Sequence, residues 1–359
     1  MKKTAKMLGM ILLFLVLLDM GVAAILRQAE MRGKMDSLVR YFDYGRSVPG
    51  KLAQWEARPN MPGNLSEVAW RSENLAISAA AFAKEPPETG PVIRSYGMSF
   101  VARILRKAQE QNPGLKWDGH AGPGAPPNFT YAMFQEDRAN RRKGDIVVLG
   151  ILSSAVPAMA ALSNRTIAFE QPAPFTYPIF RLDGEGLKRV EPLVNSADEQ
   201  RALENDPEAR RKLTNQFATE DAFYSPITFG WTWLDSSPFA RLVRRTWAMG
   251  HIAQVKNRIL AGDEYPYAEV LERMIVDFAR TAREDGQIPV VMAIQTRDAL
   301  NVDIAALTVP ILKREKIAYL ATAELFDPKD PSGFLSDGHY KPEIDARFSV
   351  AFTKLLSKP

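Results

Sequence analysis

From residue 91 onward, the chain alternates short apolar runs with stretches of helical spacing. Five runs bounded by Gly, Pro or charged residues predict strands at 92–96, 114–118, 145–150, 288–294 and 317–321. The remaining periodic stretches predict helices at 100–111, 129–142, 251–284, 300–313 and 343–356. This order predicts an α/β fold of three layers, in which a five-stranded, mainly parallel sheet lies between two layers of helices.

In such a sheet, active sites lie at the carboxyl ends of the strands. Gly97-Met98-Ser99 follows the first predicted strand and precedes a helix. A glycine at that switch lets the backbone turn sharply and presents the serine hydroxyl beside the free N–H groups of the helix N-terminus. The plainer alternative is that Ser99 only caps the helix.

A second polar stretch, Ser336-Asp337-Gly338-His339-Tyr340, lies just before the last predicted helix. It places a carboxylate two residues before an imidazole, although the same residues also suit a plain turn. A serine, a base and an orienting carboxylate are the groups that nucleophilic acyl transfer needs. We therefore predict Ser99 as the nucleophile, His339 as its base and Asp337 as the group that orients His339.

Together, these two stretches resemble the SGNH (GDSL-type) hydrolase superfamily over roughly residues 90–357. Gly97-Met98-Ser99 matches the family's Gly-Asp-Ser block except at Met98. The short spacing of Asp337 and His339 resembles the branch that contains alginate and related exopolysaccharide O-acetyltransferases. The resemblance implies a flavodoxin-like sheet and a serine-dependent esterase or O-acetyltransferase activity that needs no cofactor.

The resemblance also implies an oxyanion hole made by the serine N–H, a glycine N–H after the second strand and an asparagine after the third. Gly122 and Gly124 are the glycine candidates, although both also suit an ordinary turn. After the third strand, Gly150 matches the family's glycine, but Leu152 stands in the asparagine position and cannot donate. Either backbone groups complete the hole, or a serine hydroxyl does. The candidate hydroxyls are those of Ser153 and Ser154.

Residues 151–250 interrupt the alternation of strands and helices and are rich in proline and aromatic residues. We interpret this stretch as a large insertion after the third strand, placed where it covers the site. Its aromatic side chains either form a platform for a sugar ring or belong to the core. They are Phe175, Tyr177, Phe180, Trp231 and Trp233.

Three lysines near the N-terminus precede an apolar run from Leu8 to Leu26 that only Asp19 interrupts. At about 1.5 Å per residue, the run reaches roughly 28 Å, close to the ~30 Å hydrocarbon core of a bilayer. The lysines favour a cytoplasmic N-terminus and an external chain. We expect an uncleaved anchor rather than a signal peptide, with Asp19 near the outer interface or paired with another helix.

The sequence is therefore expected to contain an anchor at 1–27, a juxtamembrane helix and an irregular lead-in segment at 28–90, and the α/β domain at 91–357. The anchor and the resemblance together imply a single-pass protein of a bacterial inner membrane with a periplasmic domain. They also imply an acylated glycan or polysaccharide as substrate, with envelope polysaccharide-assembly proteins as further partners.

Composition argues against several other classes of function. Lys and Arg (46) only slightly outnumber Asp and Glu (42) and are spread along the chain, so nothing indicates nucleic-acid binding. The absence of cysteine excludes thiolate catalysis and cysteine metal sites. The three histidines are too dispersed to predict a metal site; we expect His120 at the rim of the active site and His251 in a helix.

The sequence also allows one alternative to an enzyme. A degenerate domain of the same fold would bind a glycan or an assembly partner without catalysis. Met98 and Leu152 favour this alternative, because they replace two residues of the family's blocks. Ser99, Asp337 and His339 favour the enzyme, because all three catalytic groups are present.

Overall fold

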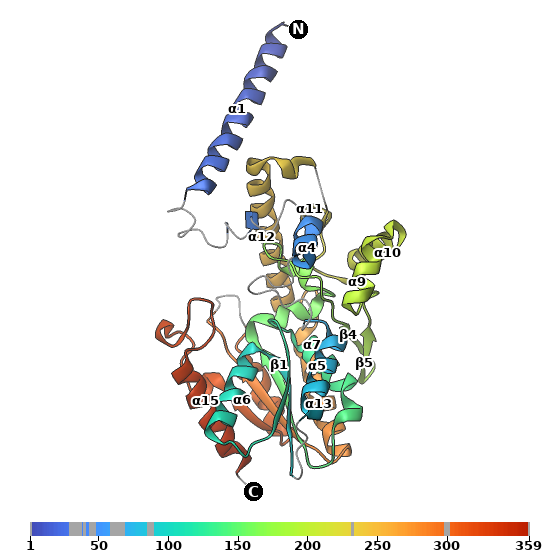
Figure 1. Cartoon of the computed structure of the whole chain (residues 1–359), viewed down its shortest axis with the longest axis vertical. Helices are drawn as coiled ribbons and strands as arrows, with labels where there is room; N and C mark the ends of the chain where they lie inside the picture. Colours follow the sequence, from blue (N-terminus) through green and yellow to red (C-terminus); the bar gives the residue numbers. More distant parts are fainter. Residues whose placement is uncertain are drawn as a thin grey trace. The chain divides into compact units, whose positions relative to one another are not determined.

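The computed structural model describes residues 2–28, 38, 41–42, 48–57, 69–84, 90–230, 233–297 and 302–357. The chain forms two compact units (Figure 1). The smaller unit consists of Met1–Ser66, Ser163–Pro174 and Asp221–Val255. The larger unit consists of Glu67–Leu162, Phe175–Glu220 and Lys256–Pro359. The stretch expected as an insertion, 151–250, therefore contributes segments to both units.

A five-stranded parallel sheet with strand order β2-β1-β3-β6-β7 forms the centre of the larger unit. The strands are β1 (Ile93–Met98), β2 (Trp117–Gly122), β3 (Ile146–Leu152), β6 (Ile288–Ile294) and β7 (Ala318–Ala321). Strands β1, β3 and β6 are buried almost throughout, as expected for a parallel sheet that is covered on both faces. The predicted α/β class and parallel sheet are confirmed.

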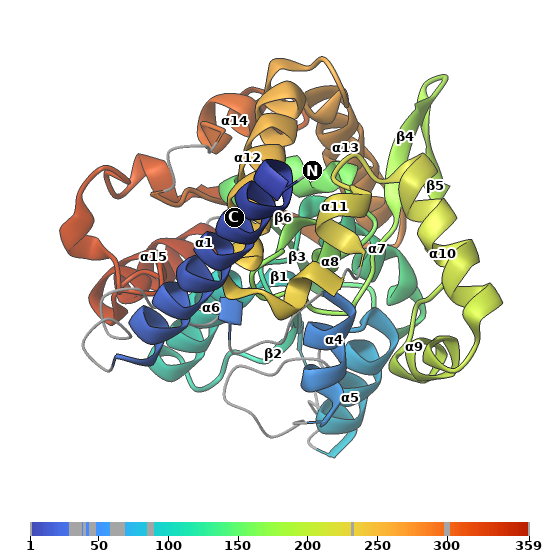
Figure 2. The ribbon, with the colours of Figure 1, turned by 90° about the horizontal axis from the view of Figure 1, so that it is seen from above.

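Helices cover both faces of this sheet. On one face, α6 (Ser99–Gln111) packs against α15 (Pro342–Leu356), and on the other α7 (Pro127–Glu136) packs against α13 (Tyr267–Glu284) (Figure 2). A further helix, α14 (Ile304–Arg314), contacts α13, β6 and β7. The apolar residues of α6 recur every three or four positions, so one side of this helix is buried.

Three predicted element boundaries are wrong. Strand β2 begins at Trp117 rather than at 114 and continues to Gly122, because it pairs with the whole length of β1. The single helix expected at 251–284 is two helices, α12 (Pro238–Ala261) and α13. They are separated where Gly262 has a φ of +84° and Pro266 precedes α13. Helix α7 ends at Glu136, well before residue 142.

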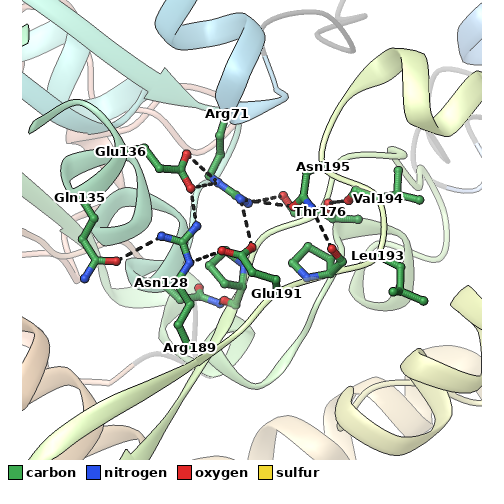
Figure 3. Close-up of polar contacts among 12 residues, drawn as sticks. Arg71, Asn128, Gln135, Glu136, Thr176, Arg189, Glu191, Leu193, Val194 and Asn195 are labelled. Atoms are coloured by element: carbon green, nitrogen blue, oxygen red, sulfur yellow. Dashed lines mark hydrogen bonds and ion pairs between the residues drawn. The ribbon is translucent and has the colours of Figure 1, made fainter. Parts of the chain in front are cut away.

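Helix α5 (Arg71–Lys84) also belongs to the larger unit, although it precedes residue 91. Its Arg71 is only 4% exposed and donates to Glu136 Oε1 at 3.1 Å, on the last residue of α7. Two further bonds reach Glu191 Oε2 at 3.4 Å and Asn195 Oδ1 at 3.3 Å (Figure 3). Because the latter residues follow the hairpin of β4 (Ile179–Asp183) and β5 (Gly186–Val190), Arg71 joins three segments that are distant in sequence.

Among the described residues, the larger unit contains six further helical elements. They are η1 (Arg138–Asn140), η2 (Ser153–Ala160), α9 (Ala197–Glu204), α10 (Pro207–Glu220), η4 (Thr322–Glu324) and η5 (Pro331–Gly333). The smaller unit contains α1 (Lys2–Arg27), α4 (Val48–Ala57), α8 (Asn164–Ile167), α11 (Pro226–Phe229), η3 (Trp233–Ser236) and α12 as far as Val255. Helix α1 is long and apolar enough to cross a membrane.

The smaller unit contains a buried lysine. Lys51 on α4 is 1% exposed, and its Nζ donates to the carbonyl oxygen of Phe169 at 2.8 Å. The same Nζ lies 3.8 Å from the centroid of the Tyr41 ring. Burial, together with the positive charges of Arg241 and Arg244, lowers the pKa of Lys51 to about 6.

Because of this lysine, we expect the free energy of unfolding to depend on pH. In the unfolded chain Lys51 keeps its usual pKa and binds a proton that the folded chain releases above pH ~6. The free energy of unfolding should therefore rise with pH from about 6 upward, by at most about 1.4 kcal/mol per pH unit from this group. Urea unfolding of the full chain in detergent at several pH values measures the slope. Lys51→Met should have a smaller slope, and an unchanged slope would contradict the prediction.

Candidate active site

Ser99 stands directly at the junction of β1 and α6. Met98 occupies the N-cap position with an extended backbone, and no side chain caps the helix there. Ser99 is therefore the first helical residue, and its hydroxyl is not used as a helix cap. The position leaves it beside backbone N–H groups that have no partner within the helix. The sharp glycine turn expected at Gly97 is absent, because Gly97 lies within the strand and has no positive φ.

The structure brings the three predicted catalytic side chains together. The Oγ of Ser99 lies 2.7 Å from the Nε2 of His339, although 240 residues separate them in sequence. The Nδ1 of His339 lies 3.1 Å from the Oδ2 of Asp337. These distances have the order nucleophile, base and carboxylate that acyl transfer requires.

Asp337 contacts His339 mainly through a hydrogen bond to the His339 backbone. Its Oδ1 accepts the backbone N–H of His339 at 3.1 Å, and this bond is the main reason why the pKa of Asp337 lies below its usual value. The carboxylate therefore stays ionised at neutral pH. The ring N–H of His339 is not aligned on the nearby Oδ2, and the side chain of Asp337 is 61% exposed. Both features make it a weaker orienting group than a buried, aligned aspartate.

Helix α6 also supports the imidazole that faces Ser99. The ring of Phe100 stacks on His339 with centroids 4.7 Å apart. One turn further, the Nε of Arg103 donates to the Oδ2 of Asp345 at 2.8 Å. Another nitrogen of Arg103 donates to the carbonyl oxygen of Tyr340 at 2.9 Å. Helix α6 thus carries Ser99 and, through Arg103, also holds Tyr340 and Asp345, the two ends of the segment that follows His339.

Arg103 is therefore expected to position the base. Arg103→Met should lower kcat toward an ester substrate by roughly 10–10² with little change in KM, because misplacing a catalytic group by about 1 Å has effects of this size. Arg103→Lys should recover part of the loss, since it keeps one charged donor. Exposed Arg106 on the same helix provides the control, as Arg106→Met. Equal kcat in the two methionine variants would show that Arg103 has no positioning role.

A cavity of about 390 Å³ is lined by Asp337 and by Phe100 and Gly338, the chain neighbours of Ser99 and His339, which are not in the lining themselves. Its lining combines side chains from the carboxyl ends of β3 and β6 with the loop after β7. The residues are Phe100, Ser154, Thr296, Arg297, Phe334, Leu335, Ser336, Asp337 and Gly338. Among the residues that the structure describes, Arg297 makes no ion pair and is exposed, so it places a positive charge at this cavity.

The two serines predicted as oxyanion donors differ in their surroundings. Ser153 is fully buried, and its Oγ accepts the backbone N–H of Thr296 at 2.9 Å, which ties the end of β3 to the end of β6. Ser154 lines the cavity and is partly exposed. Of the two hydroxyls, that of Ser154 is the one placed to reach a substrate.

The three predicted glycines lie at different places. Gly122 ends β2 and pairs with Met98, one residue before the nucleophile. Gly124 follows in the next turn with a φ of +54°. Gly150 lies inside β3, where a Cβ atom would come within 2.6 Å of Val101 and 3.1 Å of the Gly97 Cα. At Gly150 the missing side chain therefore serves the packing of α6 on the sheet.

Several other sequence expectations need correction. His120 is not at the rim of the site: it is 1% exposed, stacks on Tyr96 and lies 3.5 Å from carboxylate oxygens on the α7 side of the sheet. Phe175, Tyr177 and Phe180 are at most 2% exposed, so they belong to the core and offer no sugar platform. Trp231 lies outside the described residues. His251 lies in a helix, as expected, stacked on Trp247.

A larger cavity, of about 640 Å³, is lined by residues of α7, the β4–β5 hairpin, α13 and α14 and contains none of the catalytic groups. Of its four arginines, Arg189 pairs with Glu136 and Glu191 outside the lining, and the other three pair with carboxylates of the same lining. Arg273 bonds Glu269, Arg280 bonds Asp277 and Arg314 bonds Glu272. Size alone therefore does not make it the site of chemistry.

Sequence reasoning missed Phe100, Arg103, Thr296 and Arg297. The last two follow β6 directly, so the rule that sites form at the carboxyl ends of parallel strands predicts their location. The described residues include no cluster of three His, Asp or Glu side chains that could hold a metal ion. Neither a search of family models nor a search of curated proteins finds a match to this chain.

Proposed function

We propose that the chain is a membrane-anchored serine acyl esterase or O-acetyltransferase of the SGNH type, which acts on an extracytoplasmic polysaccharide. The observation that carries the proposal is the 2.7 Å contact of Ser99 Oγ with His339 Nε2. Asp337 at 3.1 Å from the same imidazole and the adjoining cavity add support. All of these groups gather at the carboxyl edge of a parallel sheet, where such sites form.

In the proposed reaction, the Oγ of Ser99 attacks the ester carbonyl carbon while the Nε2 of His339 accepts its proton. The tetrahedral intermediate expels the alkoxide, which takes that proton from His339, and the acyl group stays on Ser99. A water or a sugar hydroxyl then gives a proton to His339 and attacks the acyl carbon, so that Oγ leaves and recovers the proton. The acceptor alone distinguishes the esterase from the transferase.

The oxyanion of each intermediate needs fixed donors, each contributing roughly 3–4 kcal/mol to lowering the barrier. The backbone N–H groups at the start of α6 are the first donors, because Ser99 is the first residue of that helix. We assign the next donor to the hydroxyl of Ser154, which faces the cavity. Gly122 is the backbone candidate from β2, beside Met98.

The anchor and the resemblance of the two motifs support the location and the substrate class. Helix α1 begins with Lys2, Lys3 and Lys6, which favour an N-terminus inside and the remaining chain outside. A catalytic domain held at an external membrane surface would meet acylated glycans there. Envelope polysaccharide-assembly proteins are the partners that this location would bring close.

Labelling by a fluorophosphonate tests whether the serine is activated. The full chain in detergent should be labelled, and both Ser99→Ala and His339→Ala should lose the label. Ser336→Ala removes another serine at the cavity and should be labelled like the parent. A folded parent that stays unlabelled would overturn the serine mechanism and favour a glycan-binding role without catalysis.

A further inference from the structure

The start of α12 is attached to α1 through Asp19. The Oδ1 of Asp19 accepts the hydroxyl of Ser237 at 2.6 Å and the backbone N–H of Phe239 at 2.9 Å. A carboxylate at this position satisfies a free N–H group of α12 and complements its dipole. One stripe of α1 is partly covered, whereas residues 3–17 are exposed. The covered stripe consists of Leu18, Asp19, Val22, Ala23 and Leu26.

This attachment sets the depth of α12 relative to the apolar run. Asp19 precedes Leu26, the last residue of that run, by 26 − 19 = 7 residues, or roughly 10 Å at about 1.5 Å per residue. Ser237 and Phe239 share this depth, because hydrogen bonds join both directly to Asp19. If α1 spans a bilayer, the start of α12 lies at the level of the leaflet that surrounds the C-terminal half of α1.

The fully exposed residues of this region are uncharged. Apart from 231–232, which lie outside the described residues, every exposed residue between 226 and 250 is uncharged. The large apolar ones are Ile227, Trp233, Leu234, Val243, Trp247 and Met249, which together we call the apolar face. Trp233 is 74% exposed and Val243 is 55% exposed. So many large apolar side chains are unusual on a surface that faces water.

The charged side chains of the same stretch turn inward. Asp235 and Arg244 are 2% and 8% exposed and form an ion pair at 2.6 Å. Arg241 is also 8% exposed, whereas Arg245, whose side chain is 24% exposed, is neutralised by an ion pair with Glu170. In water, long charged side chains normally reach the solvent, so this arrangement is inverted. The burial of these charges fits surroundings in which a charge on the protein surface is unfavourable.

The polarity changes again further along α12. After Gly250 the next exposed residue is Gln254, on the side of the helix that carries Trp247 two turns before. Tryptophan is the residue that prefers the boundary between lipid and water. The order along α12 is therefore apolar, then tryptophan, then polar, as in a helix that leaves a membrane.

We propose that the apolar face is immersed in the leaflet that surrounds the C-terminal half of α1, where it contacts lipid. The proposal rests on the membrane anchoring of α1 that is part of the proposed function. Asp19 supplies the link, since it holds the uncharged start of α12 against the anchor. The chain is then attached by a spanning helix and by a second, partly embedded segment, η3 with the first turns of α12.

Because the chain has no cysteine, a single spin label can be placed at will. We choose Val243→Cys on the apolar face, Gln254→Cys as the polar control and Leu12→Cys as the control for α1. The labelled full chain is reconstituted into phosphatidylcholine–phosphatidylglycerol vesicles. Collisions with oxygen report lipid, and collisions with a water-soluble nickel chelate report water. Labels at 12 and 243 should collide mainly with oxygen, and the label at 254 mainly with nickel.

Three other outcomes overturn the proposal. Nickel collisions at 243 equal to those at 254, with a lipid signal at 12, would reject the embedded segment but keep the anchor. Shielding of 243 from both reagents would indicate a protein contact instead of lipid. A water signal at 12 as well would reject the anchor and the embedded segment together. Ester hydrolysis by the same preparations reports separately on the catalytic part of the proposed function.

The role of Asp19 is tested in the Val243→Cys background. Asp19→Leu removes both hydrogen bonds to the start of α12, so oxygen collisions at 243 should fall several-fold. Asp19→Asn keeps an oxygen acceptor and should retain most of the lipid signal. Unchanged collisions in Asp19→Leu would overturn the attachment on which the depth argument depends.

Discussion

Replacing Ser99 with alanine should lower kcat/KM toward a short-chain ester by roughly 10⁴-fold or more, and His339→Ala should have a similar effect. The two side chains act as one unit, because the Nε2 of His339 lies 2.7 Å from the hydroxyl that it must deprotonate. The double variant should therefore be no worse than either single variant. Initial rates of ester hydrolysis by the full chain in detergent measure all three.

In the same assay, substitution of Asp337 should lower kcat/KM less than substitution of Ser99 or His339. We expect Asp337→Ala to lower kcat/KM by roughly 10²–10³, since its carboxylate is 61% exposed and is not aligned with the ring N–H. Ser336→Ala, an exposed neighbour in the same loop, is the control and should leave the rate nearly unchanged. Activity that survives Ser99→Ala would contradict the assignment of the nucleophile, and a loss in Asp337→Ala as large as in Ser99→Ala would contradict the ranking.

Replacing Arg94 with methionine should destabilise the chain by about 3–5 kcal/mol, the range for removing one partner of a buried charge pair. Arg94 lies on β1 with a side chain that is only 5% exposed. It contacts Asp118 at 2.6 Å and Asp145 at 3.2 Å, and Asp137 lies 4.0 Å away. The side chains of these three aspartates are at most 5% exposed, so without the guanidinium their buried charges would lose a cation that they share.

Urea unfolding in detergent measures this loss. Arg142→Met is the matched control, because Arg142 also lies near Asp145 but has a side chain that is 49% exposed, at 3.9 Å. Its substitution should change the free energy of unfolding by less than about 1 kcal/mol. Arg94→Lys should fall between the two, since it keeps the charge but cannot donate to two carboxylates in the same geometry. Equal stability of the two methionine variants would contradict the role of Arg94.

Much of the candidate site could be predicted because it depends on local pattern and on one rule of sheet geometry. Ser99 and His339 each lie between a short apolar run and a helical stretch. In a parallel sheet, those junctions must meet at the carboxyl edge, whatever the sequence distance between them. The pairing of Ser99 with His339 follows that rule. The packing role of Gly150 does not, because it depends on how closely Val101 approaches the sheet.

The contacts within the smaller unit could not be predicted from local sequence pattern. Its contacts join segments that are distant in sequence, such as the hydroxyl of Tyr41 and the carbonyl of Arg241, which are 200 residues apart. No periodicity in either segment predicts that partner. In the larger unit, the spacing of residues around His120 likewise does not predict its burial, because its place inside β2 follows from its pairing with Tyr96.

The arrangement of α6 has a consequence for how the chain can vary. Ser99, the proposed nucleophile, and Phe100 and Arg103, which support the His339 segment, are all on this one helix. Of the 239 residues between Ser99 and His339, those in β2, β3, β6 and β7 build the sheet, whereas the segments that connect these strands need only return the chain to it. Since lengthening a loop adds little closure entropy, segments inserted there could diverge freely in size. Substrate preference could thus evolve independently of the chemical step.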